Sequence, residues 1–200
     1  MIRASSSPRA GIAALGLLLS LTAAADTLLL RAGHVLDVER GLTLDDQSIR
    51  IEDGRIAALA PWRDDAATGA EVIDWSAYTV LPGLMDMHSH LVGDIQSANI
   101  AAPLLSSAAQ DALAGAANAR ATLEAGFTTV RDVGCYRAFT DVALRDAIAS
   151  GQVPGPRMFV AGAYLTVTHG GGEVTGFAPD VVVPAEMRRD GADAPVPAPL

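Results

Sequence analysis

The chain has 200 residues, a formal net charge of −9 and a composition that is 50% hydrophobic and 18% charged. This balance is typical of a folded protein and excludes a disordered polyelectrolyte. The acidic excess argues against a nucleic-acid binder, because such a protein needs a basic surface. All 14 basic residues are arginine, so the chain has no lysine. The single cysteine, Cys135, excludes an internal disulfide and predicts a packing residue rather than a reactive one.

The first 25 residues have the pattern of a secretory signal peptide. Arg3 and Arg9 form a basic start, residues 11–21 are an uncharged apolar run, and three alanines precede Asp26. The run is too short to span a bilayer as a helix, and no second run of sufficient length follows. We therefore expect a periplasmic or secreted protein, cleaved after Ala25 and without a membrane span. The alternative is a buried N-terminal helix.

Residues 26–80 are expected to form a small all-β unit. Asp53 and Gly54 are a two-residue turn signal, because glycine adopts the positive φ that a tight hairpin turn needs. Residues 61–70 are polar and are expected to form a loop. Strands are predicted at 27–38, 48–51, 55–59, 71–74 and 78–81.

Beyond Pro82 and Gly83 the pattern changes to alternating strands and helices over residues 81–190. Ser107 and Gln110 fit a capping box at the start of the first helix. The order of elements predicts a parallel α/β sheet with covering helices. Residues 191–200 have neither helical nor strand periodicity and are expected to be an irregular tail. Strands are predicted at 84–91, 127–133 and 158–162, and helices at 107–125 and 138–150.

A motif suited to metal binding lies on the first of these strands. Residues 81–91 read LPGLMDMHSHL. Because side chains alternate along a strand, Asp86, His88 and His90 are expected on one face. Two imidazoles that are two residues apart on a rigid strand point into one volume, which suits a pair of metal ligands. Asp86 is expected behind them, either supporting a ligand or touching the substrate.

Four segments occur in an order that is more specific than any one of them. They are DGRIAAL (53–59), VIDWSAYTVLPGLMDMHSHL (72–91), EAGFTTVRDVG (124–134) and GPRMFVAGAYLTVTHGGGEV (155–174). Together they resemble the metal-dependent amidohydrolase superfamily, most closely its imidazolonepropionase-like and secreted Xaa-Pro dipeptidase-like branch. The resemblance implies an α/β fold: the N-terminal part of a (β/α)8 barrel, about three βα units, preceded by a small β-sandwich portion.

The resemblance also implies a site and an activity. One or two Zn²⁺ ions would lie at the carboxyl ends of the barrel strands, with His88 and His90 as ligands. The implied enzyme hydrolyses a C–N bond in an amide, cyclic imide or dipeptide, using water activated by the metal. Its partner would be a small-molecule or dipeptide substrate, and self-association into a homo-oligomer is left open.

The remaining ligands of the family are missing from this sequence. In the family they are a carboxylated lysine or a glutamate from the fourth barrel strand, histidines from the fifth and sixth, and an aspartate from the eighth. Here there is no lysine, and the other histidines are His34 in the β unit and His169 in a loop. We therefore expect a truncated, inactive fragment without a catalytic residue, ended by a frameshift or a mis-assigned terminus. The alternatives are a non-catalytic secreted half-barrel or pseudoenzyme that binds a metal or a partner chain, and one half of a split enzyme.

Two further residues are candidates for supporting a ligand or contacting the substrate. Asp132 closes a strand at the end where barrel active sites lie, although a salt bridge or a cap at the strand end would explain it equally well. His169 lies among glycines and is interpreted as lining the substrate pocket or, in the favoured alternative, as part of a mobile surface loop. Residues 170–172 are not followed by a predicted helix, so a phosphate-binding loop is not expected.

Overall fold

The computed structural model describes residues 27–67, 71–93, 99, 101–167, 170–184 and 187. These residues belong to two units that divide between Leu81 and Pro82. The predicted signal peptide, the predicted tail and His169 lie outside the described residues.

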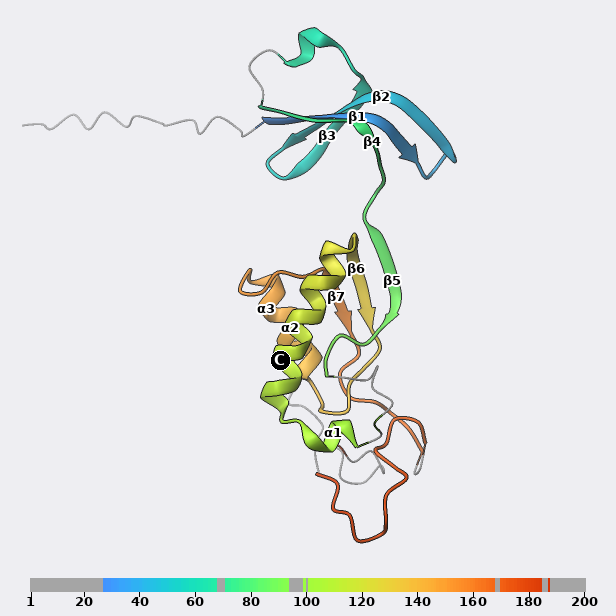
Figure 1. Cartoon of the computed structure of the whole chain (residues 1–200), viewed down its shortest axis with the longest axis vertical. Coiled ribbons are helices and arrows are strands. Elements are labelled where there is room, and N and C mark those ends of the chain that lie inside the picture. Colours follow the sequence, from blue (N-terminus) through green and yellow to red (C-terminus); the bar gives the residue numbers. More distant parts are fainter. Residues whose placement is uncertain are drawn as a thin grey trace, which may run out of the picture. The chain divides into compact units, whose positions relative to one another are not determined.

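The first unit contains a four-stranded sheet in the order β3-β2-β1-β4 (Figure 1). Strand β1 is antiparallel to β2 and parallel to β4, and β2 is antiparallel to β3. Leu30, Ala32, Val35 and Ile49 form its buried apolar core. The elements are β1 (Thr27–Asp37), β2 (Leu42–Glu52), β3 (Arg55–Pro61), the 3-10 helix η1 (Asp64–Ala67) and β4 (Glu71–Val80).

The hairpin predicted at Asp53 and Gly54 is confirmed. The two residues join β2 to β3 and both have positive φ, 50° for Asp53 and 70° for Gly54. Positive φ at both central residues defines the tight turn whose twist matches that of paired strands. The turn therefore sets the register of β2 against β3.

Two strand boundaries of the first unit differ from the prediction. Strand β2 begins at Leu42 rather than at residue 48, because residues 42–47 also pair with β1. Asp45 contacts His34 (Oδ1 to Nδ1, 2.8 Å) and Asp46 accepts a hydrogen bond from Arg31 (Oδ1 to Nε, 3.0 Å). The two short strands predicted at 71–74 and 78–81 are one strand, β4, which follows β1 across a register shift.

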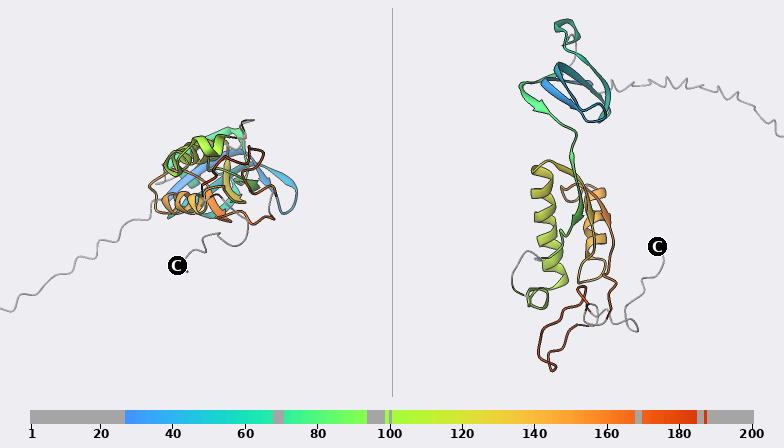
Figure 2. Two further views of the ribbon diagram at one scale, coloured as in Figure 1. Left: turned by 90° about the horizontal axis from the view of Figure 1, so that it is seen from below. Right: turned by 90° about the vertical axis from the view of Figure 1, so that its right-hand side faces the viewer.

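The second unit contains a parallel three-stranded sheet in the order β5-β6-β7. Helix α2 packs against α3 and β6, and α3 packs against β7. Figure 2 shows the alternation of strands and helices from two further directions. The elements are β5 (Leu84–Ser89), α1 (Ala102–Leu105), α2 (Ala108–Glu124), β6 (Phe127–Asp132), α3 (Thr140–Ala149) and β7 (Arg157–Val160).

Helix α2 has the predicted capping box. The Ser107 hydroxyl accepts the backbone N–H of Gln110, and the Gln110 side chain accepts the backbone N–H of Ser107. Ala119 of α2 belongs to a buried core with residues of α3, the strands and the loops: Leu91, Val92, Val130, Cys135, Leu144 and Met158. Cys135 is a buried free cysteine, as predicted. Within the described part of the chain, no helix has the length and apolar content that a bilayer span requires.

Candidate metal centre

His88 and His90 lie together at the carboxyl end of β5. The strand ends at Ser89, so His90 is the first residue beyond it rather than part of it. The two ring centroids are 5.5 Å apart and the ring planes meet at 73°. His88 is exposed and His90 is half-buried. The described structure therefore brings both predicted imidazoles into one volume at the strand end.

The orientation of the His90 ring is fixed by a backbone carbonyl. Its Nδ1 lies 2.8 Å from the carbonyl oxygen of Gly134. A carbonyl only accepts hydrogen bonds, so Nδ1 carries the ring proton and Nε2 of the neutral imidazole keeps a free lone pair. This is the arrangement in which metal-binding histidines are held by a neighbouring acceptor.

Tyr164 also contacts His90. Its hydroxyl oxygen lies 3.1 Å from Nδ1, and the two rings meet edge to face with centroids 5.9 Å apart. Burial raises the pKa of the Tyr164 phenol above its ordinary value, so the hydroxyl keeps its proton at neutral pH. The Tyr164 ring also packs where a Cβ at Gly134 would stand, 2.8 Å from the nearest ring carbon. Gly134 has φ of 121°, a conformation that favours glycine.

The strict alternation expected for Asp86, His88 and His90 is interrupted. The pairing of β5 with β6 shifts between Asp86 and Ser89, because β5 has one extra residue there. Such a bulge breaks the two-residue period of a strand. The Asp86 carboxylate accepts the backbone N–H of His88 at 3.0 Å. In the structure Asp86 thus holds the backbone of the histidine segment.

Asp132 is fully buried, and its two carboxylate oxygens hold two loops. One oxygen accepts the N–H of Leu91 at 2.8 Å, and the other accepts the N–H of Gly134 at 3.1 Å. Burial raises the pKa of Asp132, the two backbone hydrogen bonds oppose that rise, and nearby Asp141 adds to it. As a structural element Asp132 is therefore a strand-end cap rather than a salt-bridge partner, and its predicted role in supporting a ligand or contacting the substrate stays a prediction.

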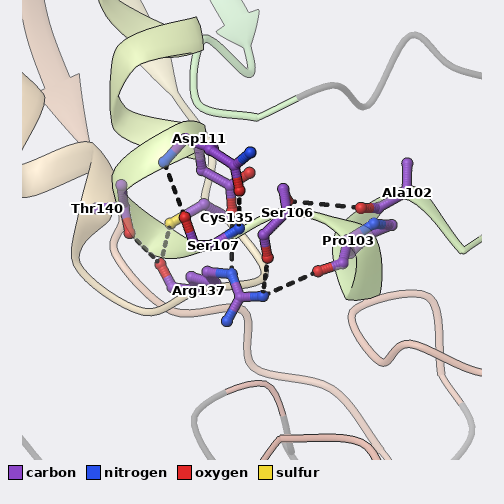
Figure 3. A network of polar contacts seen from close by, with 9 residues as sticks. Ala102, Pro103, Ser106, Ser107, Asp111, Cys135, Arg137 and Thr140 are labelled. Carbon is purple, nitrogen blue, oxygen red and sulfur yellow. Dashed lines mark hydrogen bonds and ion pairs between the residues drawn. The ribbon is translucent and has the colours of Figure 1, made fainter.

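Arg137 forms a buried cluster beside these loops, shown in Figure 3. Its Nε donates to Asp111 of α2 at 3.1 Å, and its Nη2 donates to the carbonyls of Pro103 and Ser106. The cluster borders a cavity of about 310 Å³ that Val92 and other residues of the loops after β5 and β6 also line. Because protein acceptors already engage the guanidinium, Arg137 serves to fasten α1 and α2 to the loop after β6.

The described residues of this unit include no further histidine. His34 lies on β1, in the other unit, and is paired with Asp45, while His169 is outside the described residues. Among the residues that the structure describes, no group of three or more His, Cys, Asp or Glu side chains is arranged to hold a metal ion. Two imidazole nitrogens suit Zn²⁺, but a catalytic zinc normally has three protein ligands. The described donors therefore fit two positions of such a site.

Sequence reasoning missed Tyr164 and Gly134. Neither belongs to a motif of metal-binding residue types, and Gly134 acts through its backbone carbonyl. A topological signal was nevertheless present, because both follow strands of the predicted parallel sheet. The carboxyl ends of parallel strands meet at one edge, where barrel enzymes place their functional groups.

Comparison with known proteins identifies related sequences and folds. A model of the amidohydrolase family matches residues 79–195. A dihydroorotase of Pelotomaculum thermopropionicum is 42% identical over 64 residues, 32% of this chain and 14% of that protein. An imidazolonepropionase of Sphingopyxis alaskensis is 37% identical over 73 residues, 36% of this chain and 18% of that protein.

Solved structures match more of the chain. A Xaa-Pro dipeptidase with methionine bound in its active site is 31% identical with a TM-score of 0.65, covering 80% of this chain and 40% of that one. A prolidase in complex with N-methylphosphonate-L-proline is 32% identical with a TM-score of 0.68, covering 84% of this chain and 40% of that one.

The matches bear on both the fold and the extent of the chain. They confirm the predicted fold class, with β5, β6 and β7 and their helices forming part of an amidohydrolase barrel. The chain spans less than half the length of the proteins it matches. Because the family model matches more than half of the sequence and includes β5, His88 and His90, the chain belongs to the amidohydrolase family.

Proposed function

We propose that His88 and His90 are two protein ligands of a Zn²⁺ ion in a hydrolase that acts on C–N bonds. The observation that carries the proposal is the pair of imidazoles at the end of β5, 5.5 Å apart, with the Nδ1–H of His90 donated to Gly134. When bound, Zn²⁺ supplies the activation of water and the polarisation of the substrate carbonyl. The role of the protein itself is to hold the His90 ring so that the lone pair on Nε2 stays free.

The substrate class is inferred from the relatives. Dipeptidase and prolidase structures favour a dipeptide, while the dihydroorotase and imidazolonepropionase relatives favour a cyclic amide or imide. A small molecule with one amide-like bond is common to both groups. We place the mature protein outside the cytoplasm on the strength of the signal-peptide pattern in the sequence.

We further propose that these 200 residues alone do not turn over substrate. The described residues bring together two ligands where a catalytic zinc normally has three, and the sequence has no lysine to carry a bridging carbamate. The other ligands would then come from protein outside these 200 residues, as the 40% coverage of the prolidase structures supports.

The alternative is a non-catalytic half-barrel that binds a metal or a partner chain. The observation that favours it is exposed apolar surface on the sheet of the second unit, with Met85 at 68% and Phe159 at 57% exposure. This alternative predicts a folded, soluble chain with a rigid core, whereas a poorly ordered near-UV circular dichroism spectrum would count against it.

Zinc binding by histidine variants tests the proposal directly. Titration calorimetry of the purified full chain with Zn²⁺ should show binding that His88→Ala and His90→Ala each weaken at least 10-fold. His34→Ala is the matched control and should bind like the wild type, because His34 lies in the other unit. The proposal would be contradicted by a wild-type chain that binds no Zn²⁺, or by variants lacking His88 or His90 that bind it as well as the wild type.

Turnover is a separate test of the proposed inactivity. The zinc-loaded chain should release no product from a panel of Xaa-Pro dipeptides and cyclic imides. Turnover by the wild type that His88→Ala abolishes would overturn the proposed inactivity and leave the metal site supported.

A further inference from the structure

The position of His90 is not explained by the sheet itself. The pairing of β5 with β6 ends where Ser89 lies opposite Asp132, one residue before His90. A metal ligand that stands beyond the end of its strand needs other contacts to hold it. The residue after it, Leu91, is held at both its backbone groups: Asn118 donates to its carbonyl at 2.8 Å, and Asp132 accepts its N–H at 2.8 Å.

The Asp132 carboxylate also holds the acceptor of the His90 ring. Its second oxygen accepts the N–H of Gly134, the residue whose carbonyl receives the Nδ1–H of His90. One buried carboxylate therefore fixes the backbone next to the ligand and the carbonyl that orients the ligand. We propose that Asp132 is a positioning residue for His90, which sets the direction of the His90 Nε2. This inference rests on the proposed role of His90 as a metal ligand.

A carboxylate is the side chain that suits this position. The two backbone N–H groups approach two different oxygens, and an ionised carboxylate offers acceptors on both. Asparagine has almost the same shape but only one oxygen, so its NH₂ group would face one of the two donors. An unpaired buried N–H is unfavourable, so one of the two loops would shift.

Asp141 provides a matched control. It is also fully buried, and its carboxylate accepts the N–H groups of Gly162 and Val142 at 2.8 and 2.9 Å. Its Oδ1 also accepts the thiol of Cys135, the residue after Gly134, at 3.5 Å, but none of these hydrogen bonds comes from the loop after β5 or from Gly134 itself. Asp141→Asn therefore removes a comparable buried charge without touching the contacts that orient His90.

The experiment compares Asp132→Asn with Asp141→Asn in the full chain. Ring ¹⁵N NMR at pH 8 reports which nitrogen of His90 carries the proton. We expect a single Nδ1–H form in the wild type and in Asp141→Asn, and loss of that single form in Asp132→Asn. Calorimetry with Zn²⁺ should show about 10-fold weaker binding in Asp132→Asn, the usual effect of losing a group that orients a ligand, and wild-type binding in Asp141→Asn.

The outcomes separate this inference from the proposed function. If Zn²⁺ binding does not depend on His88 and His90, the proposed function fails, and with it the metal role assigned to His90. If it does depend on them but Asp132→Asn keeps the wild-type affinity and the Nδ1–H form, the positioning role of Asp132 is overturned. Equal losses in both Asn variants would also overturn it, since they would show a general effect of core substitution.

If circular dichroism shows that Asp132→Asn does not fold, measurements on the wild type decide. NMR couplings across hydrogen bonds from the Leu91 and Gly134 amides to the Asp132 carboxylate, together with the Nδ1–H form of His90, would support the inference. An Nε2–H form, or amides without these couplings, would overturn it.

Discussion

Ser89 lies between His88 and His90, and its hydroxyl is buried without a hydrogen-bond partner among the described residues. A buried polar group without a partner costs about 1–3 kcal/mol. We therefore expect Ser89→Ala to stabilise the second unit by about 1 kcal/mol, measured by hydrogen exchange of amides in that unit. Ser48 is the control, because it is equally buried but donates to the carbonyl of Ala60 at 3.1 Å. Ser48→Ala should destabilise the first unit, and a loss of stability in Ser89→Ala would contradict the argument.

The Cys135 thiol is expected to be unreactive in the folded chain. Burial raises its pKa to about 12, with the nearby Asp141 carboxylate adding to the shift. At pH 8 the native protein should not react with a disulfide reagent such as DTNB, and reaction should begin only on unfolding. Rapid labelling of the native chain would contradict the buried position.

The same shift predicts how stability changes with pH. The thiol ionises near pH 9 when unfolded but near pH 12 when folded, so its contribution to stability is complete below pH 9 and is lost as the pH rises toward 12. Urea unfolding should therefore show a smaller decline over this range in Cys135→Ala than in the wild type. Identical pH profiles would show that the thiol does not contribute.

At the scale of elements, the buried ion pair of Arg137 with Asp111 joins the loop after β6 to α2. Its side chains are 10% and 12% exposed, so removing one partner leaves a charge in the interior. Arg137→Ala should destabilise the second unit by about 3 kcal/mol, measured by urea unfolding. Arg120→Ala is the control, because its pair with Glu124 lies on the exposed face of α2 and contributes little. Equal effects of the two variants would show that the cluster does not fasten the helices.

The elements that sequence predicts well are those with local signals. Ser107 and Gln110 mark the start of α2 and Gly126 follows its end, so both ends of the helix are encoded within a few residues. The early start of β2 is different, because it depends on pairs between Asp45 and His34 across two strands. The bulge before Ser89 likewise arises from pairing with β6, and no pattern within β5 reveals it.

The candidate site also has one part that local sequence signals predict and another that depends on contacts between distant residues. The residue types and spacing of His88 and His90 predict a pair of imidazoles, and the structure brings the rings together. The contacts that orient His90 come from Gly134 and Tyr164, 44 and 74 residues further along the chain. Such contacts depend on which strands become neighbours in the sheet. No local pattern in the sequence reveals those neighbours.

At the scale of the whole molecule, the sheet of the second unit exposes apolar side chains. Met85 pairs with Thr129, and Phe159 pairs with Arg131 two residues further along β6, so Met85 and Phe159 share one face. Exposed apolar patches of this kind favour association. We expect the chain to bind the dye ANS and to self-associate at high concentration in analytical ultracentrifugation. The double variant Met85→Ser and Phe159→Ser should lower both signals, and unchanged signals would show that this face is not responsible.

Gly134 limits which amino-acid substitutions are compatible with the candidate metal site. Its φ of 121° and the Tyr164 ring 2.8 Å from a would-be Cβ leave no room for any side chain. The same residue presents the carbonyl that orients His90. In a saturation library selected for zinc retention, glycine alone should survive at position 134, even though no glycine atom would ever touch the metal. A search for functional positions that looks only for reactive side chains would pass over it.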